Sequence, residues 1–226
     1  MRFRAASDQA LLVYLGEEIS LATHRRVVGI LRLLQAQPPP WLRNLQPAYC
    51  SLLVEFDSLQ IDHAEVETFL CACEHRAEKI TPSPARLIEI PVCYGGEFGP
   101  DLQEVASLHN LTIDRAIQLH SSHTYHAYFL GFAPGFAYLG DLPDDLATPR
   151  VATPRKKVPA GSVALAAKQT AVYPSATPGG WRLIARTPLR MFAADRNPMS
   201  LINIGDEVHF RPITPQEFAS MERESA

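Results

Sequence analysis

The chain has 226 residues, of which 46% are hydrophobic and 20% are charged, and its formal net charge is -3. This composition is typical of a globular protein with one large domain or two small ones, and it excludes a general basic surface for nucleic acid. No apolar stretch approaches the roughly 18 residues that span a bilayer. The N-terminus lacks a signal-peptide pattern and the cysteines lack C-x-x-C spacing, so we expect a cytoplasmic protein with buried free thiols.

The first part of the chain alternates between strand-like and helix-like segments. Ser20 and Asp62 are suited to cap the two helices, and the prolines at 38–40 end the first helix. The expected order is strand 9–16, helix 21–37, strand 48–57, helix 62–78 and strand 86–92. This pattern predicts a small α/β domain over residues 1–85, with a junction near 81–92.

The second part begins with a glycine-rich turn at 93–102 and two helices, 100–110 and 112–122. Pro100 lies in the first turn of one helix, and Thr112 precedes the other. Short apolar runs separated by proline and glycine follow: "YHAYFLGF", "GSVALAA", "TAVYP", "WRLIAR" and "DEVHF". Residues 86–226 therefore read as a closed or sandwiched β domain with a short helical insertion.

The familiar nucleotide and hydrolase motifs are absent from the sequence, including the phosphate-binding P-loop and the G-x-S-x-G elbow. His120, His123 and His126 are spaced by three, as metal ligands sometimes are. However, they run from a helix end into a strand, where alternate residues face opposite ways, and no carboxylate is close to them. We therefore expect no metal site, and His120 remains a candidate polar group.

A cationic segment, "TPRVATPRKKVPAGSV", is the strongest site signal. It carries Arg150, Arg155, Lys156 and Lys157, and a solvated loop would explain these charges. Alternatively, the T-P-R turns hold two guanidinium groups in directions suited to a carboxylate or phosphate. The turn that follows adds Ser162 and backbone amides, so a small anionic ligand is the second interpretation.

Two further stretches flank that segment. In "QTAVYPSATPGGW", Gln169 and Tyr173 are polar candidates, Trp181 is core or contact, and the glycines at 179–180 are expected to adopt positive φ. In "GFAPGFAYLGDLP", we expect a rigid bend shaped by three residues, Gly131, Pro134 and Gly135. The bend would place Phe136 on the rim of a pocket lined by Arg150 and Arg155, while Phe132 and Tyr138 pack in a corner.

In this order, the segments resemble one family over nearly the whole chain. "GF-x-PGF-x-YL" and "YP-x-x-TPGGW" are its most diagnostic motifs, together with "IPVCYGGEFGPDL" and "PRKKVPAGSV". The chain resembles the B subunit of bacterial ATP-dependent 5-oxoprolinase, the Kip-type histidine-kinase inhibitors and allophanate hydrolase subunit 1. The resemblance implies an α+β fold, with a small N-terminal α/β sandwich domain and a C-terminal cyclophilin-like β-barrel.

The resemblance also implies an activity. Together with the C and A subunits of 5-oxoprolinase, the chain would open 5-oxo-L-proline to L-glutamate and would be inactive alone. The complex would use ATP with Mg²⁺, because phosphorylating the lactam oxygen makes a stable amide a better electrophile, although this chain need not bind the nucleotide.

Site roles are placed on positions that match the family's motifs, except for His120, which is a candidate because it lies at the C-terminal end of a helix. Catalytic roles go to Arg150, Arg155 and Ser162. Substrate contacts go to His120, Phe132, Pro134, Phe136, Gln169, Tyr173 and Trp181. Where the family commonly has glycine, this chain has Ala164, Ala166, Ala167 and Ala171, which either continue strands or narrow a pocket.

Two other functions compete with the lactamase. The chain could be a regulatory module that inhibits a sensor histidine kinase, which a binding assay against kinases would reveal. It could instead belong to a biotin-dependent carboxyltransferase or an allophanate–urea pathway complex, which would need a carboxylase partner.

Overall fold

The computed structural model of the protein describes residues 1–77 and 84–224, and they form two compact units, Met1–Pro84 and Ala85–Ala226. The sequence placed the junction within 81–92, of which 81–83 lie outside the described residues. No helix in the described ranges is long and apolar enough to cross a membrane.

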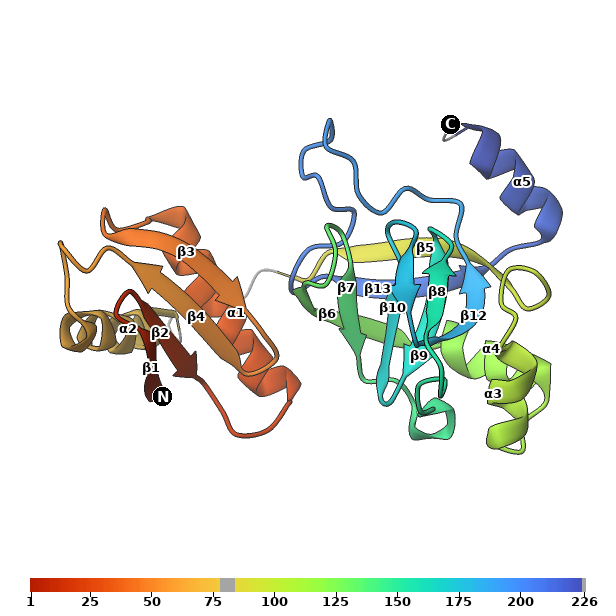
Figure 1. Cartoon of the computed structure of the whole chain (residues 1–226), viewed down its shortest axis with the longest axis horizontal. Helices are drawn as coiled ribbons and strands as arrows, with labels where there is room; N and C mark the ends of the chain where they lie inside the picture. The colour runs from red at the N-terminus through yellow and green to blue at the C-terminus, as the bar shows by residue number, and fades with distance from the viewer. Residues whose placement is uncertain (78–83, 225–226) are drawn as a thin grey trace. The chain divides into compact units, whose positions relative to one another are not determined.

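The first unit is a four-stranded antiparallel sheet with two helices, and the sheet order is β1-β2-β4-β3 (Figure 1). Along β2 and β4, buried and partly exposed residues alternate, so one face of the sheet is covered. The apolar side chains of both helices are buried as well, which places them against that face. The elements are β1 (Arg2–Ser7), β2 (Ala10–Tyr14), α1 (Leu21–Ala36), β3 (Leu42–Pro47), β4 (Ser51–Phe56) and α2 (His63–Ala77).

Both helix starts follow the predicted capping chemistry. The Ser20 hydroxyl accepts a hydrogen bond from the Thr23 N–H at 3.1 Å. Asp62 and Glu65 form a reciprocal capping box, in which each carboxylate accepts from the backbone N–H of the other residue. The capping prediction is confirmed at both positions.

The second unit is a closed barrel with the strand order β10-β7-β6-β13-β5-β12-β9, beside which β8 and β11 form a separate ribbon (Figure 1). Its elements are β5 (Leu87–Tyr94), α3 (Leu102–Leu108), α4 (Ile113–Ser121), β6 (Thr124–Leu130), β7 (Ala137–Gly140), the 3₁₀ turn η1 (Asp144–Leu146), β8 (Arg155–Val158), β9 (Ser162–Ala166), β10 (Gln169–Val172), β11 (Thr177–Gly179), β12 (Arg182–Arg186), β13 (Glu207–Pro212) and α5 (Pro215–Glu224).

Apolar side chains from the barrel strands and from α3 and α4 form one large core cluster that includes Ile90, Val163, Leu165, Val208 and Phe210. Closing the sheet into a barrel leaves these strands without free edges and buries their inward residues completely. The predicted α+β fold with a C-terminal barrel is confirmed.

Several short elements were not predicted. The cationic segment is not all loop, because residues 155–158 form β8 and pair with β11. The strands β1, β3 and β7 and the helix α5 were also missed, and α3 begins at Leu102 rather than at Pro100. The expectation of buried cysteines is wrong for Cys71, which is exposed on α2.

A tight backbone contact brings α3 to the wall of the barrel. The Asp101 N–H donates to the Leu183 carbonyl on β12 at 2.9 Å. Gly99 lies directly against the Ile184 carbonyl, where any Cβ would overlap the oxygen. The glycine-rich turn is therefore needed for close approach, and it fixes the start of α3 beside β12.

Candidate functional site

The segment that carries Arg150 is bound to the start of β12. The Val151 N–H donates to the Gly180 carbonyl at 2.9 Å. From the other side, Nε of Arg182 donates to the Pro149 carbonyl, also at 2.9 Å. These two hydrogen bonds hold the backbone on both sides of Arg150, whose own side chain is exposed.

Asp101 connects this region to α3. One carboxylate oxygen accepts from Nη2 of Arg155 at 2.6 Å, and the other accepts from the Leu183 N–H at 2.7 Å. Asp101 is only 7% exposed and occupies the N-cap position of α3, yet its side chain does not cap that helix. Its carboxylate instead joins β8 to β12.

A second carboxylate from α3 holds a second arginine. Glu104 Oε2 lies 2.6 Å from Nη1 of Arg182. The Arg182 guanidinium beside Glu104 holds the pKa of that carboxyl below its usual value. Arg182 itself is 8% exposed, so an unpaired charge there would be costly, and the ion pair stabilises it.

Aromatic side chains gather next to these charges. Phe136, Tyr173 and Trp181 are buried with Val158 and Leu183 in one cluster. The rings of Phe136 and Tyr173 lie 5.3 Å apart and those of Phe136 and Trp181 lie 5.8 Å apart, both edge to face. Trp181 is thus part of a core, one of the two interpretations that its sequence position allowed.

Tyr173 links the aromatic cluster to the arginines. Burial raises the pKa of the Tyr173 phenol, while the Trp181 N–H and the charges of Arg150 and Arg155 act in the opposite direction. The charges of both arginines therefore act on the phenol. The hydroxyl lies where a Cβ on Gly179 would be, which explains why position 179 is glycine.

The expected positive φ at residues 179–180 is wrong, because neither glycine adopts it. In the 131–136 bend, by contrast, Gly135 has φ +82°, and its Cα lies so close to Phe192 that an added Cβ would be 2.7 Å from the Phe192 Cβ. Gly135 is required for both reasons, in agreement with the predicted rigid bend.

The expectation that Phe136 lies on a rim is also wrong. Phe136, which was expected on the rim, is buried with 2% of its surface exposed. Phe132, which was expected in a packed corner, is 62% exposed. The centroid of the Phe132 ring lies 6.2 Å from that of the Tyr173 ring. The backbone of Phe132 has a φ of +67°, which is unusual for a large residue. Such strain tends to occur at functional sites, and it directs this ring outward beside the exposed Pro134.

His120 lies inside the barrel, with no exposed surface. Its Nδ1 lies 2.7 Å from the Tyr94 hydroxyl and its Nε2 lies 3.1 Å from the Thr170 hydroxyl, which donates onward to the Ala164 carbonyl. Burial lowers the pKa of His120 to about 3, so the imidazole is neutral. His120 is therefore a hydrogen-bonded core residue, and the expected substrate contact is wrong for this structure.

Ser162 and Gln169 are not brought together. Ser162 lies at the start of β9 opposite Arg186, and its carbonyl accepts from the Tyr173 N–H at 2.9 Å. Gln169 lies at the other end of the β9–β10 hairpin, opposite Ala166. Of the two residues, only Ser162 is connected to the aromatic cluster, through its hydrogen bond with Tyr173.

The four alanines at positions where the resemblance suggested glycine have two different roles. Ala164, Ala166 and Ala171 lie in β9 and β10 and pack in the buried aromatic cluster. Ala167 instead has φ +49°, in the left-handed region that favours glycine. Three of the alanines thus continue strands, as one of the two interpretations proposed.

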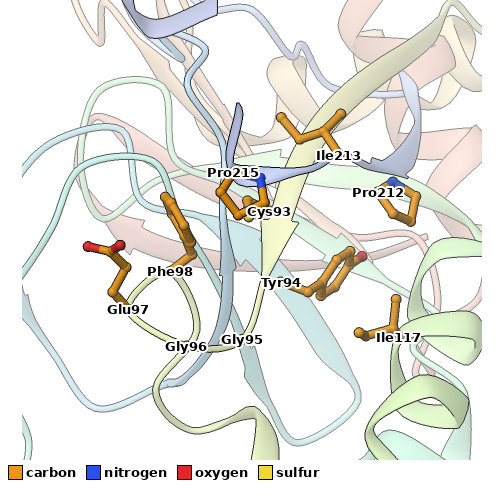
Figure 2. A pocket seen from close by; sticks show the side chains of 10 residues that line it. All are labelled: Cys93, Tyr94, Gly95, Gly96, Glu97, Phe98, Ile117, Pro212, Ile213 and Pro215. Carbon is orange, nitrogen blue, oxygen red and sulfur yellow. The ribbon is translucent and has the colours of Figure 1, made fainter. Parts of the chain in front are cut away.

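A surface hollow of about 410 Å³ lies elsewhere on the barrel. Figure 2 shows Glu97 and Phe98 on one side of it, and Ile117 and Pro212 on the other, with Tyr94 between them. None of the predicted site residues lines this hollow, and its walls are mostly apolar. In the ranges 1–77 and 84–224, no cluster of three or more His, Cys, Asp or Glu residues is arranged to hold a metal ion.

The sequence analysis singled out cations and aromatic residues that lie together in this candidate site, but it missed Asp101, Glu104 and the pairing role of Arg182. A spacing of three at a helix start does place two carboxylates on one face. Their partners, however, lie 54 or more positions further along the chain, and no local pattern shows such pairing.

Residues 1–202 match the protein family described as Carboxyltransferase domain, subdomain C and D. The chain is 40% identical over 228 residues to the 5-oxoprolinase B subunit of Bacillus subtilis, a match that covers 96% of this chain and 95% of that protein. It is 41% identical over 210 residues to the 5-oxoprolinase B subunit of Escherichia coli O157:H7, covering 91% and 93%.

Two solved structures show the same fold within longer chains. The crystal structure of TTHA0988 is 33% identical with a TM-score of 0.81; the match covers 92% of this chain, which spans only 40% of that one. The urea carboxylase of Kluyveromyces lactis is 18% identical with a TM-score of 0.78 and covers 99% of this chain and 22% of that chain. At this identity, the second match supports the fold alone.

Proposed function

Because the chain belongs to the carboxyltransferase-domain family, subdomain C and D, and is homologous to proteins named as 5-oxoprolinase B subunits, we propose that it is itself a subunit of a 5-oxoprolinase. The complex hydrolyses the lactam of 5-oxo-L-proline to L-glutamate in the cytoplasm. This chain works with homologues of the C and A subunits, and alone it is inactive.

The near full-length match to the Bacillus subtilis protein carries the proposal. Within this chain, the site around Tyr173 is suited to a small anionic ring. Arg150 offers a positive charge for the carboxylate, and Phe132 offers an apolar surface for the ring methylenes.

ATP with Mg²⁺ is the proposed co-substrate of the complex. A nucleotide–Mg²⁺ site requires several donors for phosphate oxygens and free oxygen ligands for the metal. Around Tyr173, the two described carboxylates nearest the arginines, Asp101 and Glu104, are both already held by arginines. These residues do not fit a complete nucleotide site, so we assign ATP binding to the partner proteins.

In this proposal, the chain positions the lactam. Arg150 binds the carboxylate and Phe132 contacts the ring, which orients the amide toward groups supplied by the partners. Fixing a reactant in this way lowers the entropic part of the barrier without any change in the chemical step.

The test is ATP hydrolysis by the purified chain combined with its genomic neighbours that resemble the C and A subunits. We expect hydrolysis that depends on 5-oxo-L-proline and on all three proteins. A complete mixture that binds together but never hydrolyses ATP in response to the lactam would refute the proposal. Inhibition of a sensor kinase by the isolated chain would then favour the regulatory alternative.

A further inference from the structure

Three arginines lie around the proposed lactam site, but they are not equivalent. We propose that Asp101 and Glu104 are positioning residues that neutralise Arg155 and Arg182, so that Arg150 is the one of these three arginines that binds the ligand carboxylate. The inference rests on the proposed function for the identity of the ligand, but its structural part does not.

The Asp101–Arg155 pair removes one charge from the site. Asp101 is 7% exposed and holds Nη2 of Arg155 at 2.6 Å, while its other oxygen is tied to the backbone of β12. A carboxylate that is fixed by two hydrogen bonds does not move when a ligand binds nearby. Arg155 is therefore anchored through Nη2, and Asp101 compensates its charge before any anion arrives, while its buried Nη1 has no hydrogen-bond partner among the described residues.

The Glu104–Arg182 pair acts on Arg150 through the backbone. Arg182 has its Nη1 beside Glu104, at 2.6 Å, and donates from Nε to the Pro149 carbonyl, at 2.9 Å. Pro149 directly precedes Arg150. Glu104 on α3 thus fixes the position of the Arg182 guanidinium on β12. That guanidinium in turn fixes the position of the Pro149 carbonyl, which belongs to the peptide before Arg150.

Arg150 forms no hydrogen bond or ion pair with another residue in the described part of the chain. It is exposed, and its charge acts on the Tyr173 phenol. An unpaired guanidinium on a fixed backbone is a suitable group for a carboxylate, because it does not have to give up an existing partner.

The first experiment compares two substrates in the reconstituted complex: 5-oxo-L-proline and its neutral carboxamide. We expect the wild type to prefer the carboxylate. Arg150→Ala should lower that preference in kcat/KM by about 10-fold to 100-fold, the usual effect of one charge-assisted hydrogen bond, chiefly through KM for the carboxylate. Lys156→Ala, which removes an exposed charge from β8, should leave the preference unchanged. An unchanged preference in Arg150→Ala would overturn the inference.

The second experiment tests positioning with a double-mutant cycle. Glu104→Gln should also reduce the preference, but it should have no further effect in a chain that already carries Arg150→Ala, because it acts through Arg150. Arg182→Lys should behave like Glu104→Gln, since lysine keeps a charge near Glu104 but loses the Nε–H donor to Pro149. Equal effects of Glu104→Gln in both backgrounds would indicate general damage and contradict the inference.

A third measurement does not depend on the enzymatic activity of the complex. In the isolated chain, the arginine Nε–Hε signals in nuclear magnetic resonance spectra report each guanidinium separately. Glu104→Gln should shift the signals of Arg182 and Arg150 more than that of Arg155, whereas Asp101→Asn should chiefly shift Arg155. If the complex proves inactive with both substrates, this result alone decides the structural part; an unperturbed Arg150 signal in Glu104→Gln would refute it.

Discussion

At the scale of single residues, backbone conformation explains positions that composition does not. Phe132 and Ala167 both have positive φ without being glycine, at +67° and +49°. In Phe132 this conformation accompanies an exposed ring beside Tyr173, which is consistent with a role in binding. Ala167 is the exposed first residue of the turn between β9 and β10.

Ala167→Gly should therefore stabilise the protein. A left-handed conformation costs an L-residue about 1–2 kcal/mol, whereas glycine adopts it freely, so we expect a gain of roughly 1 kcal/mol, reduced by the greater freedom of glycine in the unfolded chain. Urea denaturation measures the change. Ala166→Gly is the matched control, because Ala166 is a buried strand residue and its replacement should be destabilising. A loss of stability in both variants would contradict the explanation.

At the scale of elements, the helices and strands with a strong local sequence pattern were predicted best. The helices Leu21–Ala36 and His63–Ala77 were expected almost to the residue, because they combine periodic apolar residues with a capping side chain. The ribbon of β8 and β11 was missed because its residues are mostly cationic, proline or glycine. Those residues form strands only by pairing with each other over a long sequence separation, as Arg155 does with Gly179.

The site shows the same division. Arg150, Arg155 and Tyr173 became candidates through their residue type and spacing, and they remain a prediction. Asp101 was not, because an acid before a helix is ordinarily a cap, and only the tertiary fold brings it against Leu183 and Arg155. For the same reason His120, which was expected at a site, was found to be a core residue.

The C-terminal helix α5 depends on a capping box. Thr214 and Glu217 exchange hydrogen bonds at its start, and Phe218 packs with Cys93 and Ile213. Thr214→Ala should destabilise α5 by about 1 kcal/mol, which faster hydrogen exchange of its amides would reveal. Unchanged exchange would show that packing of Phe218 alone holds the helix.

The same box predicts a pH dependence. Hydrogen bonds from Thr214 lower the pKa of Glu217 from its usual 4.5. A lowered folded pKa gives a stabilisation that is fully present above the unfolded value and is lost as the pH falls through the folded value. Exchange of the α5 amides, corrected for intrinsic rates, should therefore increase below about pH 4.5 in the wild type but not in Glu217→Gln. The same acid response in both proteins would contradict this assignment.

At the scale of the whole molecule, the candidate site on the barrel carries an exposed arginine, Arg150, but the described residues around it lack a nucleophile paired with a base. Ser162 is near Tyr173, yet its hydroxyl forms no hydrogen bond with a described histidine or carboxylate. In the proposed function, this chain positions the lactam and the partner proteins supply the groups that complete its hydrolysis.

The most direct test of this account is an omission experiment that measures L-glutamate formed from 5-oxo-L-proline and ATP. The mixture of this chain with its homologues of the C and A subunits should form glutamate, and every mixture that lacks one protein should form none. Glutamate formed without this chain, or by this chain alone, would contradict the account.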